Sequence, residues 1–258
     1  MAMGVIGIKY PELMTVKDRD GAQTTGGDQH WYPKEGYIPP GACGATASSN
    51  ALAYVLRSRP RLYGLAAAGG LDGLAGPVPG PVHEPVTGQE SAANATGIES
   101  NTVTEAGSNT VTETGPNTKD GYLEFMKKVY RFMYPRIGGL MSGDFLTGMG
   151  ELSGEYGLPF ETERLPIPIS LAKRPAIAEV CSFIGDSLKD DIPVAFLILS
   201  NGCVEKLDTW HWVTILAIDE ETRHVQIVDN CEVFWADLGM WLDTSIMGGA
   251  FVRLRVCA

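Results

Sequence analysis

The sequence has few cysteines and no long apolar segment. None of its five cysteines forms a CxxC pair, and the odd number argues against a disulfide framework. We therefore expect a reduced, cytoplasmic environment. No apolar run approaches the roughly 18 residues that a membrane-spanning helix needs. The N-terminal sequence MAMGVIGIKYPELMTV also lacks the charged and then apolar pattern of a signal peptide. These absences predict a soluble protein without membrane insertion.

Basic residues are also scarce. The chain of 258 residues contains 20 Lys and Arg against 31 Asp and Glu, which gives a formal net charge of −11. Nucleic acids and anionic membranes are bound through basic surfaces. The composition therefore argues against both classes of partner.

One long segment lacks aromatic and basic residues altogether. Residues 64–118 contain no Phe, Trp, Tyr, Lys or Arg, and the hexamer SNTVTE occurs there twice. Such a composition cannot bury enough apolar surface to offset the entropy lost on ordering. Residues from about 67 to 119 are therefore predicted to be a flexible, low-complexity insertion. The alternative is that the NTVTE repeats form short strands. In either case the insertion interrupts a single domain over 1–258.

The rest of the chain predicts a mixed fold. Apolar residues make up 44% of the sequence, enough for one sizeable core. They recur at helical spacing over 121–134 and lie in short strand-like runs further on, while Ser142 as an N-cap and Pro175 in a first turn indicate two more helices. Helices are predicted at 121–134, 142–156 and 175–189, and strands at 193–200, 210–218, 224–230 and 249–256. Helices thus precede an antiparallel sheet, which is the order of an α+β fold.

Cys43 lies between a Pro/Gly-rich turn and a small-residue helix, in GYIPPGACGATASSNALAYVL. Pro39 and Pro40 oppose a helix that starts further upstream, so Cys43 is expected at or near the helix N-terminus. There the helix dipole and the unpaired backbone N–H groups favour a thiolate, which is the nucleophilic form of cysteine. The alternative is a buried cysteine that packs as a small apolar residue.

His211 begins the strand-like run HWVTILAI, and Trp210 and Trp212 on either side of it are expected to line a cleft. If the loop of the following hairpin has an odd length, His211 faces Asp229 directly across the two strands. A carboxylate there accepts the Nδ1–H of the imidazole and stabilises the imidazolium. A bulge or a two-residue turn would place Asn230 opposite His211 instead. The alternative for His211 itself is a structural, hydrogen-bonded histidine.

The other cysteines give weaker signals. Cys203, His211 and Cys231 offer zinc-binding side chains, but no CxxC or HxxxH spacing supports a zinc site. Cys181 lies on the apolar face of the helix predicted at 175–189 and is expected in the core. We therefore predict no metal and no other cofactor.

Three motifs together resemble the papain-like cysteine peptidases: GACGATASSNALAYV with Cys43, HWVTI with His211 and IVDN with Asp229. The resemblance is closest to the bacterial branch that includes the bacteriocin-processing, double-glycine-leader peptidases, and it covers most of 26–60 and 120–240. It implies an α+β fold with the nucleophile on a helix in one lobe and the His and Asp or Asn on a sheet in the other. It also implies that Cys43 is the nucleophile, His211 the general base and acid, and Asp229 the residue that orients the imidazole.

The resemblance further implies a glutamine, upstream of the cysteine, that stabilises the oxyanion. Gln29 in GGDQHWY is the candidate, acting with the backbone N–H of Cys43. The two residues are fourteen positions apart, which is longer than the usual spacing of the family and requires an extra loop. His30, next to Gln29, is expected to line the same cleft.

These observations predict a thiol hydrolase that cleaves a peptide or another amide through a thioester acyl-enzyme. The same residues would serve an acyltransferase or a deamidase, which differ only in the second step. A further alternative is a non-catalytic peptide-binding module on the same scaffold. The expected partner is a peptide or protein substrate.

Overall fold

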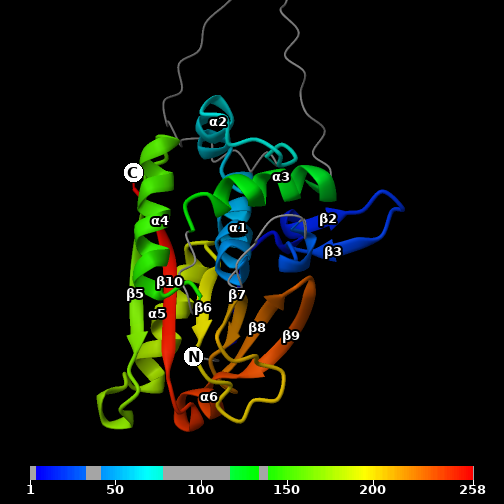
Figure 1. The fold of residues 1–258 in the computed structure, drawn as a ribbon. Coiled ribbons are helices and arrows are strands. Elements are labelled where there is room, and N and C mark those ends of the chain that lie inside the picture. The colour runs from blue at the N-terminus through cyan, green and yellow to red at the C-terminus, as the bar shows by residue number, and fades with distance from the viewer. Residues whose placement is uncertain (1–3, 33–41, 78–116, 134–138, 258) are drawn as a thin grey trace, which may run out of the picture.

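A mainly antiparallel, seven-stranded sheet forms the centre of the molecule (Figure 1). The structure is a computed structural model that describes residues 4–32, 42–77, 117–133 and 139–257. The strands of the sheet are β1 (Val5–Gly7), β5 (Phe160–Ile167), β6 (Val194–Ile198), β7 (His211–Asp219), β8 (His224–Asp229), β9 (Glu232–Asp237) and β10 (Gly249–Val256). The helices of the described residues are α1 (Ala42–Arg57), α2 (Pro60–Ala68), α3 (Lys119–Tyr130), α4 (Ser142–Glu155), α5 (Ile177–Lys189) and α6 (Leu238–Thr244).

The strand order is β5-β10-β6-β7-β8-β9, and β1 pairs with the second half of β7. Successive side chains of a strand point to opposite faces, and β7 shows this clearly. Trp212 belongs to a core that α1, α3 and α4 complete, whereas Val213 belongs to a second core with α5 and α6. The sheet is therefore covered by helices on both faces.

α1 is the most deeply placed helix, since every residue from Ala42 to Arg57 is buried. Its small side chains let it approach β7 closely. The hydroxyls of Ser48 and Ser49 both donate to the carbonyl oxygen of Ala45, at 2.9 and 2.7 Å, so their burial leaves no unsatisfied donor. The helix that carries Cys43 is thus fixed against the sheet that carries His211.

A second, smaller sheet lies beside α3. It has the order β3-β2-β4, with β2 and β3 antiparallel and β2 and β4 parallel. Its strands are β2 (Thr15–Lys17), β3 (Gln23–Thr25) and β4 (Asn117–Thr118). The chain leaves β3 directly into residues 26–29, which approach the candidate site.

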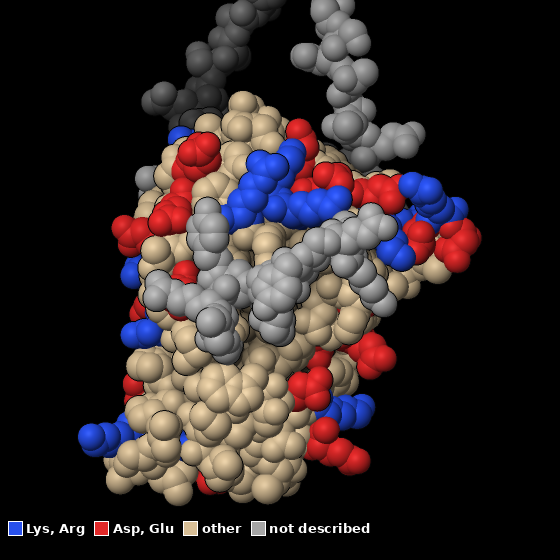
Figure 2. Space-filling model, in the orientation of Figure 1, with Lys and Arg blue, Asp and Glu red and all other residues tan. Residues whose placement is uncertain are grey.

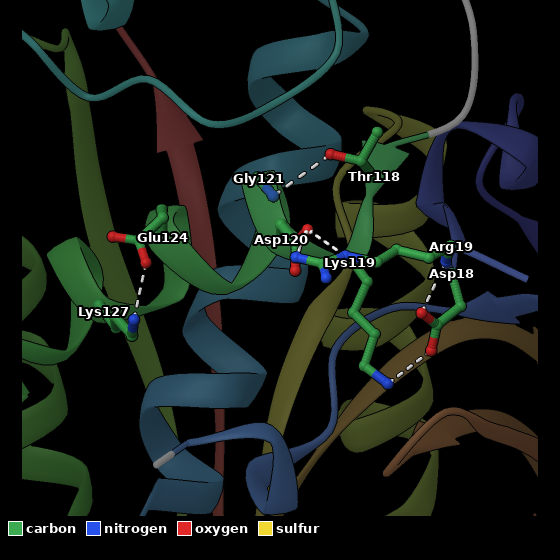
Figure 3. A network of polar contacts seen from close by, with 8 residues as sticks. All are labelled: Asp18, Arg19, Thr118, Lys119, Asp120, Gly121, Glu124 and Lys127. Atoms are coloured by element: carbon green, nitrogen blue, oxygen red, sulfur yellow. Dashed lines mark hydrogen bonds and ion pairs between the residues drawn. The ribbon is translucent and has the colours of Figure 1, made fainter.

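A polar network joins the β2–β3 hairpin to α3 (Figure 3). The ammonium group of Lys119 lies 2.6 Å from Asp18, and the guanidinium group of Arg19 lies 2.8 Å from Asp120. Lys119 also lies over the ring of Trp31, 5.2 Å from its centroid. Because the Arg19 and Asp120 side chains are mostly exposed, solvent screens their pair strongly. The network therefore sets the position of the hairpin more than it stabilises the fold.

The charged residues of one face gather over α3 and the β2–β3 hairpin (Figure 2). Lys and Arg stand there beside Asp and Glu, whereas the lower central part of this face carries few charges. This face therefore does not show the acid-free basic stripe of a nucleic-acid-binding surface. No helix in the described part of the chain is both long and apolar enough to cross a membrane.

The predicted α+β fold with a mainly antiparallel sheet is confirmed, but the predicted order holds only in part, because β1 precedes all the helices and β5 precedes α5. The strand predicted at 249–256 has the observed bounds of β10. Ser142 is the first residue of α4 and not its cap, because Met141 occupies the cap position. Cys181 is buried in α5, as expected. The strands β5 and β9 were not predicted, because their half-exposed sequences FETERLPI and EVFWAD carry charged residues.

The predicted insertion at 67–119 includes residues at both ends that belong to the folded domain. Leu71 and Leu74 belong to the hydrophobic core, and Asn117 is fully buried. The Asn117 carboxamide accepts from Ala75 N at 2.9 Å, which joins the two sides of the insertion. The rest of the predicted insertion, 78–116, lies outside the described residues, so its predicted flexibility stays a prediction.

Candidate active site

Cys43 lies in the first turn of α1, which begins at Ala42. The first four N–H groups of a helix have no partner within it, so the positive end of the helix dipole lies beside the thiol. The space at Gly44 excludes any larger residue, because a Cβ there would lie 2.5 Å from Leu140 Cδ2 and 3.2 Å from Trp212 Cδ1. The thiol is thus held in a tightly packed corner, and the residue is 7% exposed.

His211 is the first residue of β7 and pairs with Ile198 of β6. The residue before it, Trp210, has a φ of +57°, a left-handed conformation that aromatic residues rarely adopt. The chain therefore turns sharply just before the imidazole. Trp210 is left 53% exposed by this turn, whereas His211 is 6% exposed. The strand fixes the backbone of His211 while its side chain meets the end of α1.

His211 and Asp229 form a buried ion pair. The Nε2 atom of His211 donates to Asp229 Oδ1 at 2.7 Å, and the two side chains are 8% and 14% exposed. The sequence predicted that Nδ1 would be the bonded nitrogen, and the structure corrects this. With Nε2 engaged, Nδ1 is the remaining ring nitrogen, and Cys43 lines the same cavity close enough to raise the pKa of the imidazole.

The hairpin reaches this arrangement by a register that differs from the predicted one. Asp219 pairs with His224, so the loop has an even length. That register alone would bring Asn230 onto the face of His211. The ladder then shifts between Ile215 and Ala217, where β7 holds one extra residue. The shift returns Asp229 to the side of His211, displaced diagonally from the residue directly opposite.

The charges around His211 favour the imidazolium. Burial is the largest single influence and lowers the pKa of His211. The hydrogen bonds and charges of Asp229 and Cys43 act in the opposite direction, and together they raise the pKa to about 10. The imidazole is therefore protonated at neutral pH, between a carboxylate and a thiol. This is the charge arrangement in which an imidazolium supports a neighbouring thiolate.

Asn230 holds the segment that carries Gln29. Its Oδ1 accepts from the backbone N of Gln29 at 3.2 Å, so its carboxamide does not orient His211. Gln29 begins a short 3-10 helix over Gln29–Trp31 and is partly buried. His30 points to solvent and pairs with Asp28 at 2.6 Å, with 72% of its side chain exposed. The structure thus brings the Gln29 backbone to the site and leaves His30 outside it.

Cys43, His211 and Asp229 line one small cavity of about 10 Å³, room for roughly one water molecule. Trp212 is among its lining residues, and the indole N–H donates to Leu140 O at 2.7 Å. A second hollow of about 380 Å³ adjoins the first, since Asp229 and Asn230 line both. The remaining residues around this hollow are Lys206, Asp208, Glu232 and Phe234.

Sequence reasoning missed two residues of α1 that line the small cavity. Thr46 and Asn50 follow Cys43 by three and seven positions. Such spacing places residues on one face of a helix, so helical periodicity from Cys43 would have found them. Asn50 Oδ1 accepts from Gly27 N at 2.8 Å and from the Tyr122 hydroxyl at 2.9 Å.

Among the described residues, Asp208, His211 and Asp229 are the group whose ligand atoms lie close enough together, within 4.8 Å, to hold a metal ion. Neither Cys203 nor Cys231 belongs to this group, so the cysteine-containing zinc set considered from the sequence is not brought together. Asp208 is exposed, and Nε2 of His211 is already bonded to Asp229. The His211–Asp229 contact within this group is the ion pair described above.

No protein-family model matches the chain, and no curated protein matches it either.

Proposed function

We propose that the chain is a thiol hydrolase that cleaves a peptide or another amide bond. One observation carries the proposal: His211 lies between Asp229 and the thiol of Cys43, in a buried cavity at the N-terminus of α1. Three side chains from distant parts of the sequence meet there in the order nucleophile, imidazole and carboxylate. This order is the one that nucleophilic acyl transfer needs.

We propose one step for each group. The Cys43 sulfur attacks the carbonyl carbon, and we assign the developing oxyanion to the backbone N–H of Cys43 and to the carboxamide of Gln29, whose backbone is bonded to Asn230 of the same cavity. The imidazolium of His211 then gives its proton to the leaving nitrogen as the C–N bond breaks, which leaves a thioester on Cys43. Water attacks this thioester while His211 takes a proton, and the C–S bond breaks to release the acid. Asp229 holds the ring in one orientation throughout.

The papain-like resemblance supports the same assignment. The nucleophile lies on a helix that packs against the sheet carrying the histidine and aspartate, in one chain interrupted between α2 and β4. In that family the acid or amide follows the histidine on the next strand, as Asp229 follows His211 here. We therefore propose a papain-like domain, related most closely to the bacterial, bacteriocin-processing branch.

The hollow beside the triad is the proposed substrate site. Its volume of about 380 Å³ falls in the range of about 300–1,000 Å³ that small-molecule sites occupy. It shares Asp229 and Asn230 with the cavity of Cys43. We therefore assign a side chain of the substrate to this hollow, next to the cavity that holds the thiol.

The proposal is tested by labelling with a peptide chloromethyl ketone and mapping the modified cysteine by mass spectrometry. We expect Cys43 to be labelled at neutral pH, and His211→Ala to abolish the labelling. The exposed thiols of Cys203 and Cys257 serve as internal controls of ordinary reactivity. Labelling of these two cysteines in preference to Cys43 would contradict the proposal and favour the peptide-binding module.

A further inference from the structure

The tip of the β8–β9 hairpin has an unusual backbone. Asn230 and Cys231 form its two-residue turn, with φ of +44° and +71°. A turn of this type normally has glycine at the second position, because only glycine adopts positive φ without cost. Cysteine there is strained, and such strain persists where the surroundings hold the residue. The contacts of this turn explain what holds it.

Both side chains of the turn reach the same segment. Asn230 Oδ1 accepts from Gln29 N at 3.2 Å, and Cys231 Sγ donates to Gly26 O at 3.5 Å. The turn that follows Asp229 is therefore docked onto residues 26–29. Cys231 is half-buried in this contact, and its burial raises the pKa of the thiol to about 11, so it stays a neutral donor at physiological pH.

The same segment is held from the other side by α1. Asn50 Oδ1 accepts from Gly27 N at 2.8 Å, one step from the Gly26 that Cys231 contacts. The fit is tight, because a Cβ on Gly26 would lie 2.9 Å from Asn50 Oδ1, and one on Gly27 would lie 2.6 Å from Met126 Sδ. Segment 26–29 is thus clamped between the helix of Cys43 and the hairpin of Asp229.

We infer that Asn230 is a positioning residue that sets the oxyanion site. By fixing the backbone of Gln29 relative to Asp229, it fixes where the Gln29 carboxamide lies relative to Cys43; the inference rests on the proposed thiol hydrolase. Asn50 fixes the other end of the segment. Asparagine suits the position because its carbonyl accepts the bond and its backbone tolerates positive φ. Asn230, next to Asp229, therefore positions the oxyanion donor Gln29 and does not orient the imidazole of His211.

The test separates reactions that build an oxyanion from those that do not. Iodoacetamide alkylates a thiolate without forming a tetrahedral oxyanion, whereas p-nitrophenyl acetate acylates it through one. Asn230→Gly removes the carbonyl acceptor and relaxes the positive φ. We expect this variant to slow acylation of Cys43 by p-nitrophenyl acetate by about ten- to hundred-fold, less than the loss of a whole oxyanion donor. Alkylation by iodoacetamide should stay within about two-fold.

Two further variants make the test specific. Asn230→Asp keeps an acceptor oxygen and should restore acylation to within a few-fold of wild type. Gln29→Ala should slow acylation at least as much as Asn230→Gly, and the double variant should be no slower than Gln29→Ala alone, because both changes remove the same interaction. Asn201→Gly, at an exposed loop asparagine, is the matched control.

Each result has one meaning. Unchanged acylation in Asn230→Gly would overturn the inference, as would additive losses in the double variant. An equal fall in alkylation and acylation would overturn it too, since that result indicates general damage to the site. A wild-type Cys43 that iodoacetamide alkylates no faster than Cys203 would instead refute the proposed function, and the inference with it.

Discussion

The ion pair of His211 and Asp229 gives the sharpest prediction. Replacing Asp229 by Asn keeps the size of the side chain and an acceptor oxygen but removes the negative charge. The pair is buried, with 8% and 14% of the two side chains exposed and 2.7 Å between Nε2 and Oδ1. Solvent screens this ion pair little, so removing the Asp229 charge should destabilise the imidazolium by nearly the full strength of the interaction.

The size of the effect follows from the charge-assisted bond. Hydrogen bonds to charged groups contribute about 1.5–3 kcal/mol. At about 1.4 kcal/mol per factor of ten, Asp229→Asn should shift the equilibrium from imidazolium toward imidazole by about ten- to hundred-fold. The titration midpoint of His211 then falls below its wild-type value of about 10. Cys43 also raises the pKa of His211, and this contribution remains in the variant.

The assay is an NMR titration of the histidine ring protons in the full chain. His30, exposed and paired with Asp28, serves as the internal reference because Asp229→Asn leaves this pair intact. A wild-type His211 that titrates near the ordinary value of about 6.5 would refute the reasoning. So would a midpoint that Asp229→Asn leaves unchanged.

Three further predictions concern stability. The folded chain holds the His211 proton up to about pH 10, whereas unfolded histidine releases it near pH 6.5. The stabilisation is therefore complete below about pH 6.5 and lost as pH rises to about 10, so the urea midpoint should fall across this window in wild type but not in His211→Gln. Trp212→Phe leaves Leu140 O without its 2.7 Å donor and should cost about 1–3 kcal/mol in urea unfolding; no loss would contradict the buried bond. Asn117→Ala should lower the melting temperature clearly, whereas Arg19→Ala, at a mostly exposed ion pair, should leave it unchanged; the reverse order would contradict the account.

Short-range sequence signals predicted the fold well. Apolar periodicity found α3, helix-start signals at Ser142 and Pro175 found α4 and α5, and strand-like runs found β6, β7, β8 and β10. These signals work because burial on a regular element leaves a regular pattern. β5 and β9 were missed because charged residues break that pattern on their half-exposed faces. The edges of the insertion were missed because composition averages over a window, while Leu71 and Asn117 act as single buried residues.

The sequence predicted which residues meet in the candidate site but not how they contact one another. Cys43, His211 and Asp229 were chosen from their positions at the ends of predicted elements, and the structure brings all three to one cavity. The bulge between Ile215 and Ala217 decides which residue meets the imidazole, and no local sequence signal marks it. The same holds for Asn230, whose partner Gln29 lies 201 residues away in the sequence.

The most direct test of the central claim is the rate of Cys43 alkylation by iodoacetamide as a function of pH. We predict that at neutral pH Cys43 is alkylated faster in the wild type than in His211→Ala, because the imidazolium of His211 lies beside the thiol only in the wild type. The difference between the two proteins should shrink as the pH rises through about 10, where His211 loses its proton. Identical profiles in the two proteins would contradict the claim that His211 and Cys43 act as one catalytic pair.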